Sequence, residues 1–316
     1  MSSEETGAGL AKASILVLGG SYFLGRAIAA SLHAAGAEVI CLNRGSRRPE
    51  PGTRQIVCDR GDPVALRASL TGAFDVIVDV SAYRPVEVAG VLDALARPPT
   101  KYVFISSAAV YDDARASVPF REEDPSGGSR IWGDYGVDKA RCEDLLSSRL
   151  GQSLFILRPP YVYGPNNYLQ RERFIWSRLL QQKPVFVPER GETRVQFMFV
   201  ETLAAFVTQI ALALDVPAGT YNVGESSAYS FNEWIETLAS VANTAASIRY
   251  VSDPDIPARA YFPFRNSGLT LDVSRFDSIA RDRGPLLQSG SALTLASMQG
   301  TVDPYAPTAW EKVWLG

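Results

Sequence analysis

The sequence predicts an α/β protein with a doubly wound parallel sheet and a smaller second lobe, and three observations support this prediction. Short, almost wholly apolar runs alternate with amphipathic helical stretches through the first half of the chain. The first apolar run passes through a glycine turn directly into a helical stretch. The alternation ends after Gly164-Pro165-Asn166. Apolar strands separated by helices are typical of a parallel sheet that helices cover on both faces.

Six apolar runs are the expected strands of this sheet. They lie at 14–18, 38–42, 55–58, 75–80, 102–106 and 154–158. Helical periodicity fills the segments between them, at 24–35, 62–71, 86–97 and 136–149. Ligands of doubly wound sheets bind at the carboxyl ends of the strands, so the turns after these runs are the expected place of a site.

The chain after residue 166 has a different character. The stretch 168–182 reads as an aromatic-rich helix, PVFVP at 184–188 as a strand, and 230–242 as a further helix. We expect a dinucleotide-binding domain over 13–165, with 197–224 returning to it. We expect 166–196 and 225–316 to form a loop-rich, substrate-binding lobe that closes over a cleft.

The glycine turn, VLGGSYFLGRA, has the character of a dinucleotide site. A strand that enters a helix through such a turn presents free N–H groups to a pyrophosphate. Gly19 and Gly25 hold the outer positions of G-x-x-G-x-x-G, and Tyr22 replaces the middle glycine. A tyrosine fits there if its φ is negative and its ring points outward or lies along the phosphate path as a lid. The expected cofactor contacts of this turn are Gly19, Ser21, Tyr22, Phe23, Leu24 and Gly25.

Composition argues against several classes of function. The chain has 316 residues and a formal net charge of −3, whereas a nucleic-acid-binding protein is expected to carry a basic balance. His33 is the only histidine, so neither a metal centre nor a Ser-His-Asp triad is expected. No apolar run reaches the length of a membrane span, and MSSEETG at the start lacks a signal-peptide pattern. The three cysteines, Cys41, Cys58 and Cys142, lack CxxC spacing and are expected to be reduced in the cytoplasm.

Acid–base chemistry is indicated by Tyr135 and Lys139, which form a YxxxK motif on an expected helix. Residues four apart share one helix face, and a nearby ammonium favours the phenolate form of a tyrosine. Such a phenolate can take a hydroxyl proton while hydride leaves the same carbon. Ser107, at the end of an expected strand, can hydrogen-bond the reacting oxygen and complete a Ser/Tyr/Lys set.

With these motifs the sequence resembles the extended short-chain dehydrogenase/reductase family, in its NAD-dependent epimerase/dehydratase branch. The resemblance covers about residues 14–290 and rests on VLGGSYFLG, CDR, SSAAVY, YGVDK, LRPPYVYGP and YNVG in the family's order. It implies a Rossmann fold and assigns Tyr135 as the acid/base. It implies that Lys139 lowers the pKa of Tyr135 and holds the nicotinamide ribose, and that Ser107 binds the substrate oxygen.

The resemblance also implies the remaining contacts. Asp59 matches the residue that hydrogen-bonds the adenine, and Tyr161 and Val162 are expected near the nicotinamide. The further cofactor contacts are Asn43, Arg44, Arg60, Val80, Ser81 and Ala82. The expected substrate contacts are Tyr83, Ser107, Asn166, Arg194 and Arg265, although Arg194 is displaced by one position from the family's phosphate-binding arginine.

Two departures from the family pattern bear on cofactor and reaction. NAD-specific relatives place an acid where this chain has Asn43, and the neighbouring Arg44 can pair with a 2′-phosphate, so NADP is favoured over NAD. The Asp-Glu pair of the 4,6-dehydratases is replaced by Ala108 and Ala109, which cannot transfer protons.

These features favour an epimerase that transiently oxidises a carbinol of a nucleotide sugar or sugar phosphate. An NADP-dependent reductase or dehydrogenase of a keto-sugar or polyol is the alternative of the same class. A non-catalytic binding protein is the alternative of another class. No membrane or nucleic-acid partner is expected, and a homodimer through 86–97 and 136–149 is compatible with the pattern.

Overall fold

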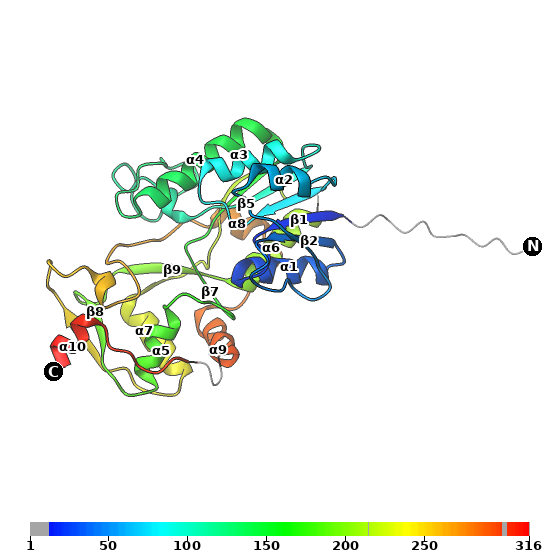
Figure 1. Ribbon diagram of the computed structural model, residues 1–316. Helices are drawn as coiled ribbons and strands as arrows, with labels where there is room; N and C mark the ends of the chain where they lie inside the picture. Colours follow the sequence, from blue (N-terminus) through cyan, green and yellow to red (C-terminus); the bar gives the residue numbers. More distant parts are fainter. Residues whose placement is uncertain (1–12, 214, 299–301, 316) are drawn as a thin grey trace, which may run out of the picture.

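A seven-stranded parallel sheet forms the centre of the larger lobe (Figure 1). The computed structural model describes residues 13–213, 215–298 and 302–315. The sheet strands are β1 (Ser14–Leu18), β2 (Glu38–Asn43), β3 (Arg54–Val57), β4 (Val76–Asp79), β5 (Lys101–Ile105), β6 (Leu154–Arg158) and β10 (Gly219–Asn222). Their order is β10-β6-β5-β4-β1-β2-β3, which places the crossover point between β1 and β4. The predicted α/β class with a doubly wound parallel sheet is confirmed.

Helices cover both faces of this sheet (Figure 1). On one face lie α1 (Phe23–Ala34) and α6 (Val200–Leu212), and on the other α2 (Pro63–Ser69), α3 (Pro85–Ala94) and α4 (Asp134–Leu150). Successive side chains of a strand point to opposite faces, so β1 contributes to two separate cores. Ile15 and Val17 belong to one core, whereas Leu16 and Leu18 belong to the other. This explains why the run is apolar at every position.

The second lobe is built from two small sheets and several helices. Its strands are β7 (Tyr161–Tyr163), β9 (Arg194–Phe199) and β11 (Ala228–Ser230) in one sheet, and β8 (Val185–Pro188) and β12 (Ile248–Val251) in the other. Its helices are α5 (Glu172–Leu179), α7 (Phe231–Val241), α9 (Leu287–Ser297) and α10 (Ala309–Leu315), while the short α8 (Ser274–Ile279) packs against β10 of the large sheet. Aromatic rings of Phe197, Trp234 and Phe264 fill its core.

The expected helix over 168–182 is shorter in the structure. Helix α5 begins at Glu172 and ends at Leu179, so Tyr168 and Arg171 stay in the preceding loop. Asn167 explains the late start, because its side-chain oxygen accepts the N–H of Leu169 at 3.1 Å and stabilises a turn. The loop thereby carries side chains that a helix would have directed elsewhere.

A buried ion pair anchors the C-terminal helix α10 on the second lobe. Arg178 of α5 and Glu311 of α10 are 1% and 0% exposed, and their atoms Nη2 and Oε2 are 2.6 Å apart. Trp314 of the same helix packs against Phe186 and Tyr261. The helix is therefore held by both charge and apolar contact.

Two further expectations concern the environment of the protein. The three cysteines are buried and form no disulfide. Within the residues that the structure describes, no helix is long and apolar enough to cross a membrane. The polar start MSSEETG lies outside the described residues.

Candidate functional site

A cleft of about 1060 Å³ opens at the carboxyl ends of the central strands, where the fold predicts a ligand. It brings together eighteen of the predicted site residues, which come from both lobes. These are Gly19, Ser21, Tyr22, Phe23, Leu24, Gly25, Asn43, Arg44, Asp59, Arg60, Val80, Ser81, Tyr83, Ser107, Tyr135, Lys139, Tyr161 and Val162. Their roles in binding and catalysis stay predictions.

The glycine turn has the geometry that a pyrophosphate requires. A Cβ atom at Gly25 would lie 2.1 Å from the carbonyl oxygen of Gly19, so only glycine lets α1 pack this closely on the turn. No side chain caps the N-terminus of α1, and its first turn has no acid. The free N–H groups and the helix dipole therefore remain available to an anion. Phe23 has φ +37°, a strained value for a residue with a side chain, and such strain is common at binding sites.

Tyr22 adopts the backbone that the sequence analysis required of a non-glycine residue. Its φ is −146°, in the extended region. Its ring lies 4.6 Å from the ring of Tyr168, and the Arg47 guanidinium carbon is 3.9 Å from the centre of the Tyr22 ring. Both partners also line the cleft. Tyr22 thus forms part of a wall that joins the turn to two neighbouring loops.

Replacing Tyr22 with glycine is expected to change cofactor affinity by no more than about tenfold, or about 1.4 kcal/mol. The reason is that the N–H groups of α1 are the expected phosphate contacts, whereas the Tyr22 ring packs on Tyr168 and Arg47. Calorimetric titration of the parent and the Tyr22→Gly variant with NAD and NADP measures this difference. If the parent binds neither and the variant binds one, Tyr22 blocks the site and the cofactor assignment is wrong.

The end of β2 presents an unpaired donor to the cofactor side of the cleft. Asn43 Oδ1 accepts the N–H of Gly45 at 2.9 Å and Nε2 of Gln55 at 2.7 Å. Its Nδ2 is buried and has no hydrogen-bond partner. Buried polar atoms are rarely left unsatisfied, so this amide fits an oxygen of a bound ribose or phosphate. Arg44 beside it is exposed and forms no ion pair among the described residues.

Arg60 does not offer a free guanidinium to a cofactor, which corrects the expectation of a direct contact. Its Nη1 and Nη2 bind the buried Asp79 at 2.7 and 2.9 Å, and Nη1 also reaches Ser81 Oγ at 2.8 Å. Only Nε lacks an acceptor. Asp79 in turn accepts the Tyr102 hydroxyl at 2.8 Å. Arg60 therefore fixes the floor of the cleft below Ser81.

The predicted catalytic set converges at the other end of the cleft. A Cβ at Gly136 would lie 2.2 Å from the Ala109 carbonyl oxygen, so this glycine allows α4 to approach the Ser107 segment. The Ser107 side chain lies close enough to Tyr135 to act on the pKa of its hydroxyl, and Ser107 Oγ accepts the N–H of Ala109 at 3.2 Å. Tyr135 is 40% exposed, on the open side of the cleft, whereas Lys139 is only 3% exposed. This arrangement places a phenol and a serine hydroxyl where one substrate oxygen can meet both.

The pKa of Tyr135 differs in direction from the sequence expectation. Desolvation of the hydroxyl raises it, although the Ser107 hydrogen bond and the Arg171 charge act to lower it. Lys139 Nζ donates to the Ile105 carbonyl at 2.7 Å. Burial lowers the pKa of Lys139 itself to about 8. In the chain alone the pKa of the Tyr135 phenol therefore lies above its usual value.

Four predicted residues lie outside the surface of this cleft. Ala82 is fully buried behind the end of β4, and its N–H donates to Asp79 Oδ1 at 3.1 Å. Asn166 lines a neighbouring pocket. Arg265 is exposed, with its guanidinium carbon 5.5 Å from the ring centre of Trp132, which does line the cleft. A direct contact of Ala82 with a cofactor is excluded by its burial.

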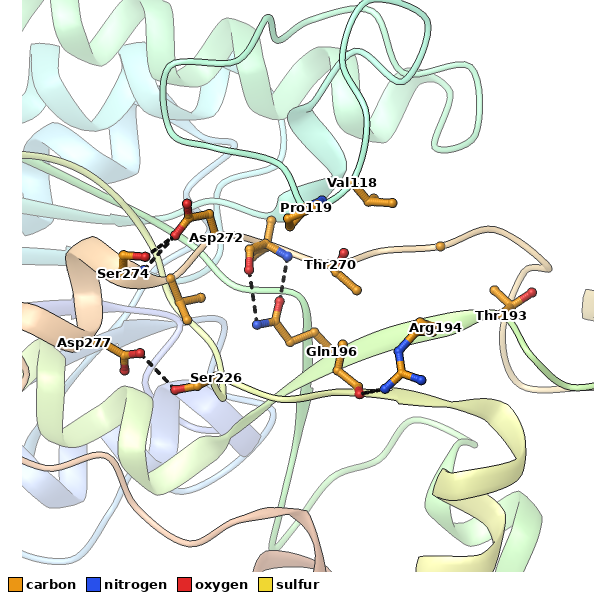
Figure 2. A pocket seen from close by; sticks show the side chains of 14 residues that line it. Val118, Pro119, Thr193, Arg194, Gln196, Ser226, Thr270, Asp272, Ser274 and Asp277 are labelled. Atoms are coloured by element: carbon orange, nitrogen blue, oxygen red, sulfur yellow. Dashed lines mark hydrogen bonds between the residues drawn. The ribbon is translucent and has the colours of Figure 1, made fainter.

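Arg194 lies in a separate pocket of about 740 Å³, shown in Figure 2. Its Nη2 donates to the Ala228 carbonyl and lies 3.3 Å from Glu233 Oε2. Gln196, two residues on, points to the same pocket and bonds the backbone of Leu271. The expected phosphate contact of Arg194 at the catalytic cleft is therefore wrong. The one-residue displacement is its cause, because adjacent residues of a strand point to opposite faces.

The structure adds cleft residues that the sequence reasoning missed, among them Trp132, Tyr168 and Arg171. Tyr168 and Arg171 were assigned to a helix, whereas they lie in the loop before it. The Asn-Asn pair at 166–167 was the available signal for that loop, because asparagine favours turns. Nothing in the sequence marks Trp132.

Comparison with known proteins agrees with this arrangement. Residues 15–224 match the NAD dependent epimerase/dehydratase family. A relative in Arabidopsis thaliana, "Chloroplast stem-loop binding protein of 41 kDa b", is 27% identical over an alignment of 281 residues, and the match covers 83% of this chain and 72% of that protein.

Two solved structures share the fold. The UDP-glucose 4-epimerase of Thermotoga maritima with UDP-glucose has a TM-score of 0.76 at 16% identity, and the match covers 92% of this chain and 100% of that one. The Bordetella bronchiseptica enzyme WbmG in complex with NAD has a TM-score of 0.75 at 17% identity, covering 94% and 97%.

Proposed function

Because the chain belongs to the NAD dependent epimerase/dehydratase family, we propose that it is a sugar-modifying enzyme that works by transient oxidation of a carbinol. The favoured reaction is epimerisation of a nucleotide sugar. The single observation that carries the proposal is the presence of Ser107, Tyr135 and Lys139 in one cleft with the glycine turn of α1. A solved UDP-glucose 4-epimerase shares this fold, and the NAD bound to the solved enzyme WbmG, which also shares it, supports a nicotinamide cofactor here.

The chain's own residues then have defined tasks. The N-terminus of α1 and Asn43 hold the cofactor, which supplies a hydride acceptor when bound. Ser107 would donate a hydrogen bond to the substrate oxygen, and Tyr135, in its phenolate form, would accept the proton of the carbinol as hydride leaves the carbon. Return of the proton by Tyr135 accompanies reduction of the ketone on its other face. Positioned acid–base groups of this kind contribute about 10²–10⁴-fold to a rate.

The lining of the cleft disfavours a dehydratase. Elimination of water requires a second acid and base near the substrate. The two positions after Ser107 are Ala108 and Ala109, which are 1% and 2% exposed and carry no titratable group. The only carboxylates that line the cleft, within the described residues, are Asp59 and Glu87. Glu87 is bound to the N–H groups of Tyr83 and Arg84 at 2.8 and 3.1 Å.

An epimerase and a net reductase differ in whether reduced nicotinamide is consumed during turnover. An epimerase converts its substrate with no net change in reduced nicotinamide, whereas a reductase consumes one equivalent per turnover. We propose to incubate the protein with a panel of UDP-sugars and keto-sugars, and to follow product by chromatography and the cofactor by absorbance. Absence of product with any sugar, from a protein that binds the cofactor, would contradict the proposed function.

NADP is expected to bind more tightly than NAD, because Arg44 is exposed at the end of β2 and has no ion-pair partner among the described residues. The Arg44→Ala variant is expected to lose most of that preference, by about 1.5–3 kcal/mol for a charge-assisted hydrogen bond. Calorimetry with both cofactors measures it, and Arg54→Ala, which removes an exposed arginine that pairs with Glu38 at the start of β2, is the control. If the parent protein binds NAD and NADP with equal affinity, the predicted NADP preference is wrong, and Asn43 is assigned to a ribose hydroxyl.

A second candidate function is the binding of a nucleic-acid stem-loop, which the name of the Arabidopsis relative suggests. The observation that favours it is a pocket of about 600 Å³ beside the glycine turn. Four arginines and two tyrosines line this pocket: Arg26, Arg47, Arg48, Arg173, Tyr22 and Tyr168. Arginines attract phosphates and tyrosines stack on bases. Titration of a labelled RNA hairpin at physiological salt tests this candidate, and lack of binding removes it.

A further inference from the structure

Three arginines surround Tyr161 at the substrate end of the cleft. The charges of Arg171, Arg259 and Arg265 all act on the Tyr161 hydroxyl, whose pKa burial raises to about 12 against their influence. None of the three forms an ion pair with a carboxylate in the part of the chain that the structure describes. Two carboxylates line the cleft. Asp59 follows strand β3, and Glu87 lies in helix α3. This end of the cleft therefore carries an excess of positive charge.

Arg171 is the arginine of this group that lines the cleft itself. Its guanidinium carbon lies 4.7 Å from the ring centre of Tyr161 and 5.8 Å from that of Phe264. Among the described residues, the guanidinium forms one hydrogen bond, from Nη1 to the Val162 carbonyl at 3.3 Å. Burial and the charge of Arg259 lower its pKa, while Glu172 and Tyr161 act to raise it. The aromatic rings thus hold a poorly solvated guanidinium whose remaining donors have no acceptor in the part of the chain that the structure describes.

Glu172 does not neutralise this cation by a direct contact. It is the next residue in the chain, but its side chain is 1% exposed and forms no ion pair with Arg171. Its Oε2 instead accepts Nδ2 of Asn167 at 3.0 Å. Burial also raises the pKa of this carboxyl. The guanidinium of Arg171 therefore remains available to a ligand.

Arg171 also acts on the proposed acid/base. Its charge lowers the pKa of Tyr135 against the effect of desolvation, so the two side chains lie within electrostatic reach in one cleft. Phe197 lies on the face of β9 that packs toward Tyr161 and Phe264. Its ring centre is 6.3 Å from that of Tyr161 and 6.0 Å from that of Phe264. Arg194 lies on the opposite face, in the pocket of Figure 2. Arg171 therefore lines the cleft beside Tyr161, whereas Arg194 lies outside the cleft.

We propose that Arg171 binds an anionic oxygen group of the substrate, a phosphate or a carboxylate, close to the carbon on which Tyr135 acts. This inference rests on the proposed function, because it assumes that the cleft binds a sugar derivative. A planar guanidinium with free donors binds either oxyanion through paired hydrogen bonds. Arg259 and Arg265, which are exposed, strengthen the attraction without direct contact. The substrate class is therefore an acidic or phosphorylated sugar.

The test measures binding, not turnover, so that it stands apart from catalysis. The parent protein, saturated with whichever of NAD or NADP it binds, is titrated calorimetrically with glucose, glucose 1-phosphate, UDP-glucose and glucuronate. The same titrations are made with Arg171→Gln and with Arg194→Gln, the matched control from the separate pocket. Thermal unfolding checks that both variants fold.

At least one anionic ligand is expected to bind about tenfold more tightly than glucose in the parent. Arg171→Gln should remove that gain and leave cofactor affinity unchanged, whereas Arg194→Gln should retain it. A gain with glucose 1-phosphate or UDP-glucose identifies a phosphate, and a gain with glucuronate alone identifies a carboxylate. The inference is overturned if no anion exceeds glucose, if Arg171→Gln keeps the gain, or if both variants lose it. Failure to bind any cofactor would instead overturn the proposed function.

Discussion

Replacing Tyr135 with phenylalanine is expected to lower turnover by about 10²–10⁴-fold, the usual contribution of a positioned acid–base group. The substitution removes one hydroxyl from a ring that is 40% exposed in the cleft, so the fold and cofactor affinity should change little. The measurement is the rate of sugar conversion under saturating cofactor, together with a cofactor titration.

The control for this substitution removes a tyrosine hydroxyl elsewhere. Tyr250 of β12 is 54% exposed and lies outside the cleft. Tyr250→Phe should therefore leave turnover unchanged. Full activity of Tyr135→Phe on the same substrate would show that another group transfers the proton.

Replacing Glu311 with alanine is expected to lower the free energy of unfolding by about 3–5 kcal/mol. The reason is that Arg178 would be left buried and unpaired, since it is 1% exposed and bonds both Glu311 oxygens, at 2.7 and 2.6 Å. The variant also loses the bond from the Thr308 N–H that caps α10. Urea denaturation followed by circular dichroism measures the change.

An exposed ion pair is the matched control for this loss. Glu38 and Arg54 lie 3.0 Å apart, with side chains 46% and 74% exposed. Surface pairs contribute little because water screens both charges, so Glu38→Ala should cost less than about 1 kcal/mol. Equal losses in the two variants would mean that the C-terminal helix does not depend on the buried pair.

Local pattern was sufficient to predict the sheet and much of the cleft. The bounds of β1 and β6 match the expected runs 14–18 and 154–158, because strands covered on both faces are apolar throughout. Gly25 and the Ser107, Tyr135 and Lys139 set were identified by spacing, and the fold brings them to one cleft. Parallel strands end at one edge of a sheet, so turns far apart in sequence meet there.

Other features depend on contacts that no local pattern contains. Arg60 was expected to face the cofactor, but Asp79, on β4, takes its guanidinium. Arg171 escaped notice because its environment comes from Tyr161 and Phe264, which are distant in sequence. The pKa of Tyr135 depends on the burial of its hydroxyl and on the charge of Arg171, neither of which a local pattern contains. The displacement of Arg194 by one residue was visible in the sequence. That it places the side chain outside the cleft could be known only from the orientation of β9.

The central claim, that the cleft is a working nicotinamide site, is tested most directly by calorimetric titration of the purified protein with NAD and NADP. The account predicts that one of them binds with a stoichiometry of about one per chain at micromolar concentration, within the usual range for small ligands. Binding should also raise the unfolding temperature, because the ligand binds only the folded state. Absence of binding by both cofactors at millimolar concentration would contradict the claim, and the chain would then be a member of its family without redox chemistry.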